Sequence, residues 1–250
     1  MMDIWAFLAL PFVLRLTRVS AFIAAAPILG SPAVPAVVKV GLAMLLAVFF
    51  NIVFPINLGL EIPPLTAGLM VVGEVIVGLA LALVARLVYM AVQQGGMILA
   101  QQMGLSDAEA IDPVSGEQNE SIASFLETVF AILFLAGGGF QLLISVLARS
   151  QSAFPTGGMP DVPMLTRAIV TSGSAMLLLG LKLAAPALAA FLVLAVVLAI
   201  LSRILPDMNI LMESYPLRLA LGLVMAAAMM PLMGQFTADL AAWMSRAFTG

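Results

Sequence analysis

The chain has 250 residues, of which 63% are hydrophobic and 9% are charged. A soluble globular domain has roughly 45–50% apolar and about 25% charged residues. The mean hydropathy over the whole sequence is +1.18, in agreement with this apolar excess. The composition excludes an ordinary water-soluble domain and predicts an all-α, polytopic helical membrane protein.

Missing residue types exclude several kinds of chemistry. The sequence contains no His and no Cys, which removes thiol nucleophiles, disulfides, His/Cys zinc sites and Ser-His-Asp triads. The three glycines at 137–139 are not followed by the Lys-Ser or Lys-Thr of a phosphate-binding loop. A net charge of −3 argues against nucleic acid as a partner. We therefore expect no catalytic residue, no cofactor, no metal and no nucleic-acid partner.

Two helices are predicted near the N-terminus. The first covers residues 3–26 and ends before a cluster of Pro and Gly residues that begins at Pro27. We expect this segment to be retained, because it lacks the basic start of a cleaved signal peptide. The second helix covers 35–54, and a polar, proline-rich loop follows it.

The third predicted helix, residues 65–103, is too long for a simple membrane span. Its 39 residues would extend about 58 Å, against a bilayer core of about 30 Å. We expect a long helix that bends at Gly95-Gly96 or extends out of the membrane plane.

An acidic loop, residues 104–121, separates the two halves of the chain. Five acids and no base lie in it, and their spacing does not match a calcium-binding EF-hand loop. A fourth element at 121–150 should be loosened by its three central glycines. After a loop at 151–163, a fifth element at 164–205 should be broken near Lys182 and Pro186 into two arms.

A last apolar run, 219–236, precedes a short amphipathic tail. Within this run, methionines recur at four-residue steps and so share one helix face. Such a stripe either packs in a core or faces a channel or an adaptable partner. Its members are Met225, Met229 and Met233.

Charged residues inside apolar helices are candidates for function, because burying a charge in a membrane is costly. We expect most of them to contact other subunits, although snorkelling to an interface and transport chemistry remain open. A proton-coupled carrier would use Glu74, the one clearly mid-span acid. These residues are Arg15, Arg18, Glu74, Arg86, Lys182 and Arg203.

Several short motifs occur in an ordered series. They are Arg18-Val19, Ala25-Ala26-Pro27-Ile28-Leu29-Gly30, Val34-Pro35, Gly73-Glu74 with Gly78, Gln102-Met103-Gly104-Leu105, Asp112-Pro113 with Gly116, Phe154-Pro155 with Gly157, Ala184-Ala185-Pro186, Arg203-Ile204-Leu205-Pro206 and Met208-Asn209. Through these motifs the chain resembles the FliR family of flagellar export-apparatus membrane proteins and its injectisome counterparts in type III secretion. The resemblance covers nearly the whole chain.

The resemblance implies a non-enzymatic subunit of a protein-export gate in the bacterial inner membrane, at the flagellar basal body. The gate would contain FliP and FliQ subunits, contact FlhB and FlhA, and pass unfolded export substrates. The implied fold is one membrane domain of long kinked helical hairpins, similar to FliP and FliQ. Its N-terminal helices would occupy about 1–103 and its C-terminal hairpins 122–250, in contact with membrane lipid and partner subunits. An injectisome subunit is the alternative.

The resemblance also assigns a role to the acidic loop, as a plug that enters the export pore. A turn-rich, polar segment of this kind cannot pack in lipid. Asp112-Pro113 would set its turn and Gly104 would be its hinge. The expected plug residues are Gly104, Leu105, Ser106, Ala110, Ile111, Asp112, Pro113 and Gly116.

Overall fold

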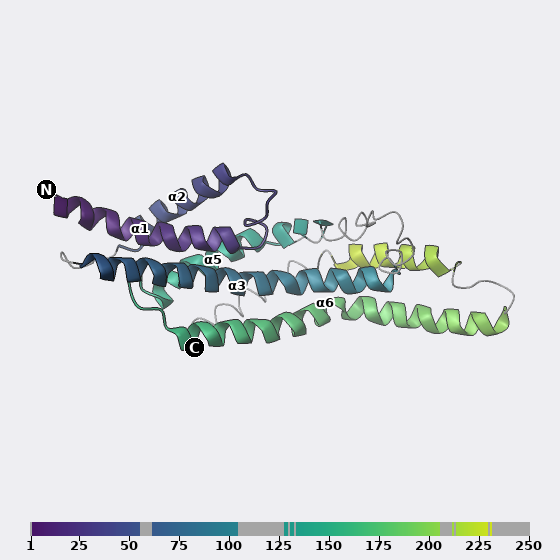
Figure 1. Ribbon diagram of the computed structural model, residues 1–250. Helices are drawn as coiled ribbons and strands as arrows, with labels where there is room; N and C mark the ends of the chain where they lie inside the picture. The colour runs from purple at the N-terminus through teal and green to yellow at the C-terminus, as the bar shows by residue number, and fades with distance from the viewer. Residues whose placement is uncertain are drawn as a thin grey trace, which may run out of the picture. The chain divides into compact units, whose positions relative to one another are not determined.

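The computed structural model describes residues 2–55, 62–104, 128–129, 131–132, 134–205, 212, 214–229 and 231. Within these residues the regular secondary structure is helical and no strand occurs (Figure 1). The labelled helices are α1 (Met2–Ala25), α2 (Ala36–Val53), α3 (Pro64–Gln102), α5 (Gly139–Ala153) and α6 (Val162–Ile204). A shorter apolar helix covers Ser214–Met229. The prediction of an all-α chain is confirmed.

Of the described helices, α2, α3 and α6 are long and apolar enough to cross a membrane. Only 17% of α2 and 28% of the most apolar stretch of α6 are buried inside the chain. Exposed Val, Leu and Ile side chains at this density would be unfavourable in water. These helices therefore require lipid or other protein subunits around them, and the polytopic membrane class predicted from composition is confirmed.

The ends of α1, α2, α3 and α6 agree with the prediction to within a residue or two, but the predicted interruptions do not all occur. The helix α3 passes through Gly95-Gly96 as a single α-helix. The prediction of a break near Pro186 was wrong, because α6 remains one α-helix across this proline. A proline removes one backbone hydrogen bond, and neighbouring contacts in a membrane protein can compensate for that loss.

The interruption expected at the three central glycines is confirmed. A turn at Gly137-Gly138 precedes α5, and Gly138 has a φ of +92°, which a residue with a side chain rarely adopts. Gly139 lies against the buried ring of Phe134, where an added Cβ would lie 2.2 Å from the ring atom Cε1. Glycine is therefore needed both for the turn and for the space beside the ring.

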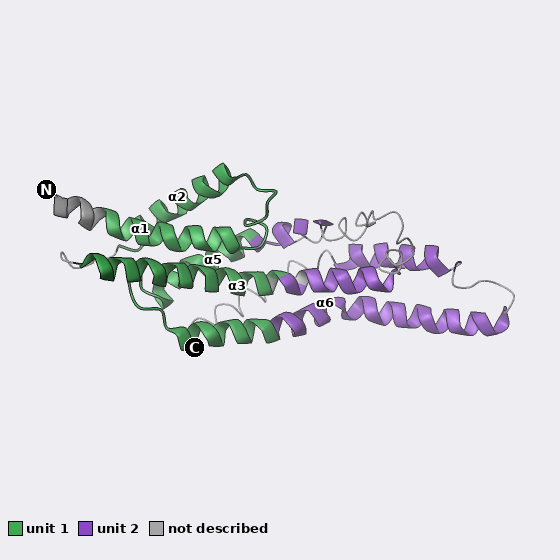
Figure 2. Cartoon of the chain, viewed as in Figure 1, with its two compact units in different colours: residues 1–89, 140–174, 240–250 green, residues 90–139, 175–239 purple. Residues whose placement is uncertain are grey.

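The chain forms two compact units, to both of which α3 and α6 contribute (Figure 2). Unit 1 comprises residues 1–89, 140–174 and 240–250. Its α1 packs on α2, and its buried apolar side chains include Phe22, Phe50, Leu81 and Leu147. The division into 1–103, 104–121 and 122–250 predicted from the sequence stays a prediction.

Unit 2 comprises residues 90–139 and 175–239. Here Leu183 of α6 lies against Gly95 of α3, where an added Cβ would be 2.9 Å from the leucine Cδ2. Small residues at such positions allow two membrane helices to approach closely. The Tyr215 hydroxyl donates a 2.6 Å hydrogen bond to the Gly104 carbonyl, which ties the Ser214–Met229 helix to the end of α3.

Candidate functional site

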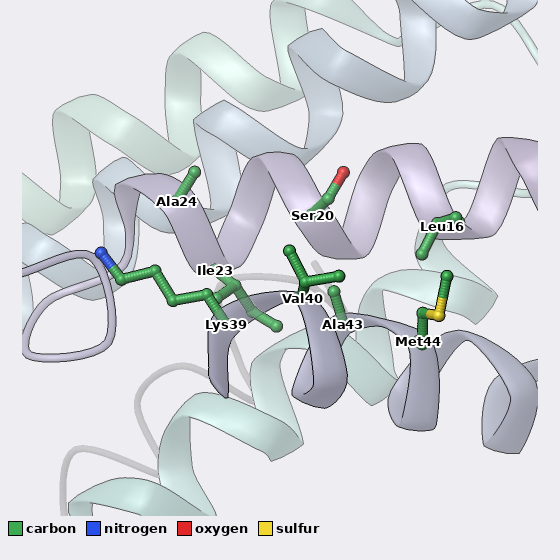
Figure 3. Close-up of a pocket in the computed structure, with 8 residues that line it drawn as sticks. All are labelled: Leu16, Ser20, Ile23, Ala24, Lys39, Val40, Ala43 and Met44. Carbon is green, nitrogen blue, oxygen red and sulfur yellow. The ribbon is translucent and has the colours of Figure 1, made fainter. Parts of the chain in front are cut away.

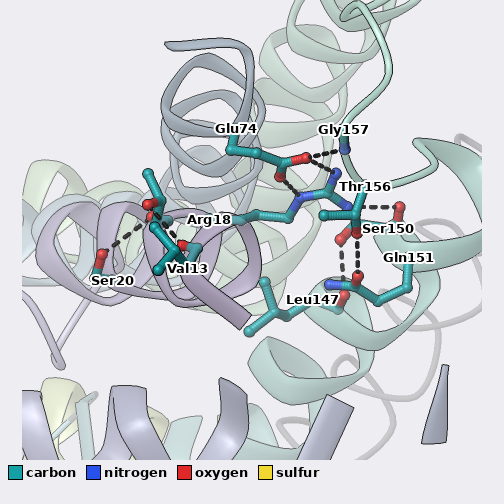
Figure 4. Close-up of polar contacts among 10 residues, drawn as sticks. Val13, Arg18, Ser20, Glu74, Leu147, Ser150, Gln151, Thr156 and Gly157 are labelled. Carbon is teal, nitrogen blue, oxygen red and sulfur yellow. Dashed lines mark hydrogen bonds and ion pairs between the residues drawn. The ribbon is translucent and has the colours of Figure 1, made fainter. Parts of the chain in front are cut away.

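A buried ion pair joins α1 to α3 in unit 1 (Figure 4). The Arg18 guanidinium donates from Nε to Glu74 Oε2 at 2.5 Å and from Nη2 to Glu74 Oε1 at 3.1 Å. The two side chains are 1% and 2% exposed. Two parallel hydrogen bonds fix the orientation of both side chains as well as their separation. The pair therefore holds α1 and α3 in one register.

Two backbone groups extend this pair to the α5 region. Arg18 Nη1 donates to the Ser150 carbonyl near the end of α5 at 3.2 Å, and the Gly157 N–H donates to Glu74 Oε1 at 2.7 Å. In the same turn, the Thr156 hydroxyl donates to the Gln151 side-chain oxygen at 3.2 Å. The polar cluster thus connects α1, α3, α5 and the turn after α5, although these segments are far apart in sequence.

Glycine at position 78 permits the close helix approach that the cluster needs. Gly78 lies one helical turn after Glu74, and an added Cβ there would be 2.5 Å from the Arg18 carbonyl oxygen and 2.9 Å from the Ala21 Cβ. Any larger residue would push α1 away from α3. Because the pair spans this contact, its geometry depends on Gly78.

The second buried arginine binds to the end of α2. The Arg15 guanidinium donates to the carbonyl oxygens of Phe50 and Phe54, at the C-terminus of that helix. The last carbonyls of a helix carry partial negative charge, and the Phe50 carbonyl also accepts a hydrogen bond from the Phe54 N–H. Arg15 therefore neutralises the end of α2, while Arg18, three residues later on α1, binds α3 and α5.

The other charged residues predicted from the sequence lie outside the Arg18–Glu74 cluster. Arg86 on α3, and Lys182 and Arg203 on α6, are exposed on the chain. Their long side chains can extend away from an apolar helix without being enclosed by it. The prediction that they contact other subunits is not tested by these positions. Arg18 and Glu74, in contrast, have each other as partners within one chain.

The structure describes only some of the remaining predicted residues. Gly104 has a φ of +78° and ends the turn after α3. The other predicted plug residues lie outside the described residues: Leu105, Ser106, Ala110, Ile111, Asp112, Pro113 and Gly116. Of the methionine stripe, Met229 is buried and Met225 is half-buried, and Met233 also lies outside the described residues.

The arrangement provides a structural clamp. Both Glu74 oxygens accept hydrogen bonds: Oε2 from Arg18, and Oε1 from Arg18 and the Gly157 N–H. Among the described residues, no group of three or more His, Cys, Asp or Glu could hold a metal ion. A carboxylate held in this way fixes the relative positions of the helices that meet at it.

Sequence reasoning missed the backbone partners in the cluster. The Ser150 carbonyl and the Gly157 N–H act through main-chain atoms, so their residue types give no signal. Gly78 did give a signal, since it follows Glu74 by four residues and so shares its helix face. That spacing predicts a place where another helix comes close to the acid.

Comparison with known proteins identifies the family. Residues 9–243 match the family described as Bacterial export proteins, family 1. The chain is 34% identical over 227 residues to the flagellar biosynthetic protein FliR of Escherichia coli strain K12, covering 90% of this chain and 86% of that protein. It is 32% identical over 222 residues to the Bacillus subtilis FliR, covering 86% and 83% of the two chains.

A translocation protein is also similar over a shorter region. The Yop proteins translocation protein T of Yersinia pestis is 28% identical over 166 residues, covering 65% of this chain and 63% of that protein. The matched residues 9–243 include Arg15 and Arg18 of α1 and Glu74 of α3. The chain belongs to the bacterial export proteins of family 1, the family that the FliR resemblance predicted.

Proposed function

We propose that this chain is a core export-gate subunit of the flagellar type III secretion apparatus. With FliP and FliQ subunits it forms the channel that passes unfolded flagellar proteins across the bacterial inner membrane, in the flagellar basal body. It contacts FlhB and FlhA, other proteins supply the energy, and the chain itself is not an enzyme. The observation that carries the proposal is the family match over residues 9–243.

The relatives favour a flagellum over an injectisome. The Escherichia coli FliR aligns with 90% of the chain, whereas the Yop translocation protein T aligns with 65%. The family match and the similarity to both relatives support the broader assignment, a subunit of a type III secretion export apparatus. An injectisome subunit is the alternative within this assignment.

The geometry supports a protein built to assemble with others. The helices α2 and α6 expose apolar side chains along much of their length, and α1, α3 and α5 are fixed to each other by the Arg18–Glu74 cluster. A rigid internal clamp beside extensive apolar surface is what an assembling membrane subunit needs. A proton-coupled carrier is not favoured, because Glu74, its candidate proton site, is held by Arg18 and Gly157.

Mild purification of the tagged full-length chain should recover a stable particle that contains the FliP and FliQ of the same cell. Mass spectrometry of the particle identifies the co-purifying subunits. Recovery of injectisome counterparts would establish the alternative, and a lone monomer from membranes that contain all the partners would contradict the export-gate proposal. An untagged strain taken through the same purification is the control.

Deleting residues 106–118 should make the closed export gate leak small ions, because these residues belong to the proposed plug. The measurement is the conductance of the purified particle in planar bilayers, with and without the deletion. The particle with its intact loop, in the same bilayer, is the matched control. Equal conductance of the two particles, at equal incorporation, would contradict the plug assignment while leaving the subunit assignment intact.

A further inference from the structure

An apolar groove lies between α1 and α2 in unit 1, with a volume of about 340 Å³. Carbon-rich side chains line it from both helices, and the stem of Lys39 completes the lining (Figure 3). Leu16 and Met44 lie at one end of this row, and the Lys39 ammonium lies at the other. The groove therefore has an apolar body and one cationic end.

The connection between the two helices holds the cation in place. Lys39 Nζ donates to the carbonyl oxygens of Gly30 and Ser31 at 3.1 and 2.9 Å. An ammonium has three N–H donors, so one donor remains beyond these two bonds. The sequence has no acidic residue between positions 4 and 60, so this part of the chain offers no carboxylate to pair with Lys39.

The surroundings of the groove are suited to lipid. Only 17% of α2 is buried inside the chain, and this helix is a candidate membrane span. A flexible acyl chain can adapt its shape to such a groove and gain van der Waals contacts with its apolar walls.

We propose that this groove binds one acyl chain of an anionic phospholipid, with the lipid phosphate at the free donor of Lys39. The phosphate supplies the negative charge that residues 4–60 lack, and the apolar walls hold the chain. The lipid would then fill the space between α1 and α2. This site does not depend on the proposed export function.

Photo-crosslinking of the full-length chain in lipid nanodiscs tests the headgroup. Phosphatidylglycerol and phosphatidylcholine, each carrying a diazirine on one acyl chain, are compared at equal concentration. We expect phosphatidylglycerol adducts on peptides that contain Ile23 or Met44, and about fivefold weaker labelling for Lys39→Gln, the factor typical of one basic residue near an anionic surface. Lys39→Arg should retain the labelling, and Lys182→Gln, on exposed α6, should leave it unchanged.

A groove-filling variant tests the acyl chain. Ala43→Phe places a ring in the groove and should abolish the adducts, whereas Leu45→Phe, on an exposed position outside the lining, should not. Equal labelling by the two lipids, adducts confined to other peptides, or a crosslink from Met44 to a co-purifying subunit would each overturn the proposal. The lipid comparison on the unaltered chain decides the question even if Ala43→Phe does not fold.

Discussion

Glu74→Gln is expected to lower the free energy of unfolding by about 3–5 kcal/mol, the range found when one partner of a buried ion pair is removed. Gln is nearly the same size and can still accept the hydrogen bond from Gly157, but it has no negative charge. Arg18 would then be a buried cation without a counter-charge, because its side chain is 1% exposed and arginine does not deprotonate in proteins. Unfolding in mild detergent, followed by circular dichroism, measures the change.

A matched control and a double variant separate charge from volume. Arg86→Gln removes an exposed charge from the same helix and should change stability by no more than about 0.5 kcal/mol. The double variant Arg18→Met with Glu74→Leu removes both charges and should be more stable than Glu74→Gln, because apolar residues can replace a buried pair with little loss. A double variant as unstable as the single one would contradict the ion-pair explanation.

The same change should also reduce flagellar assembly if the chain is the proposed export subunit, because less folded subunit would reach the membrane. If the cluster is a clamp, Glu74→Gln lowers the amount of folded subunit in the membrane, and motility falls in proportion. If Glu74 instead carried protons, the subunit would accumulate normally while transport stopped. Quantifying the membrane-embedded chain and motility in the same cells therefore distinguishes the two roles.

The helices could be predicted from the sequence because apolar length and Pro or Gly boundaries are local signals. The ends of α2 and α3 lie within one residue of the predicted positions. The continuity of α6 across Pro186 could not be predicted in this way, since it depends on how neighbouring groups compensate for a lost hydrogen bond. Local sequence indicates where a helix is weakened, but packing decides whether it ends.

The buried cluster was predictable in its residues but not in its connections. The cost of a charge in an apolar helix identified Arg18 and Glu74. Their pairing joins positions 56 residues apart, and periodicity along a single helix has no information about such a contact. The same cost argument also identified Arg86, which is exposed on this chain, because the exposure of a helix face depends on which neighbours pack against it.

Gly78→Ala should destabilise the chain, although replacing glycine by alanine usually stabilises a helix by about 0.4–1 kcal/mol. The added Cβ would lie 2.5 Å from the Arg18 carbonyl oxygen, a backbone atom that can move only with α1. Overpacking of this kind typically costs about 1–3 kcal/mol, and displacement of α1 would also lengthen the hydrogen bonds between Arg18 and Glu74. The net change should therefore have the opposite sign to the helix preference.

Gly68→Ala is the matched control for this prediction, because Gly68 lies on the same helix and an added Cβ there meets nothing within 4 Å. Its unfolding midpoint in the same detergent should be equal to or higher than that of the unaltered chain, while the midpoint of Gly78→Ala should be lower. Midpoints that rise in both variants would show that α1 and α3 can separate without loss. In that case the close contact at Gly78 could not be what keeps Arg18 and Glu74 in register.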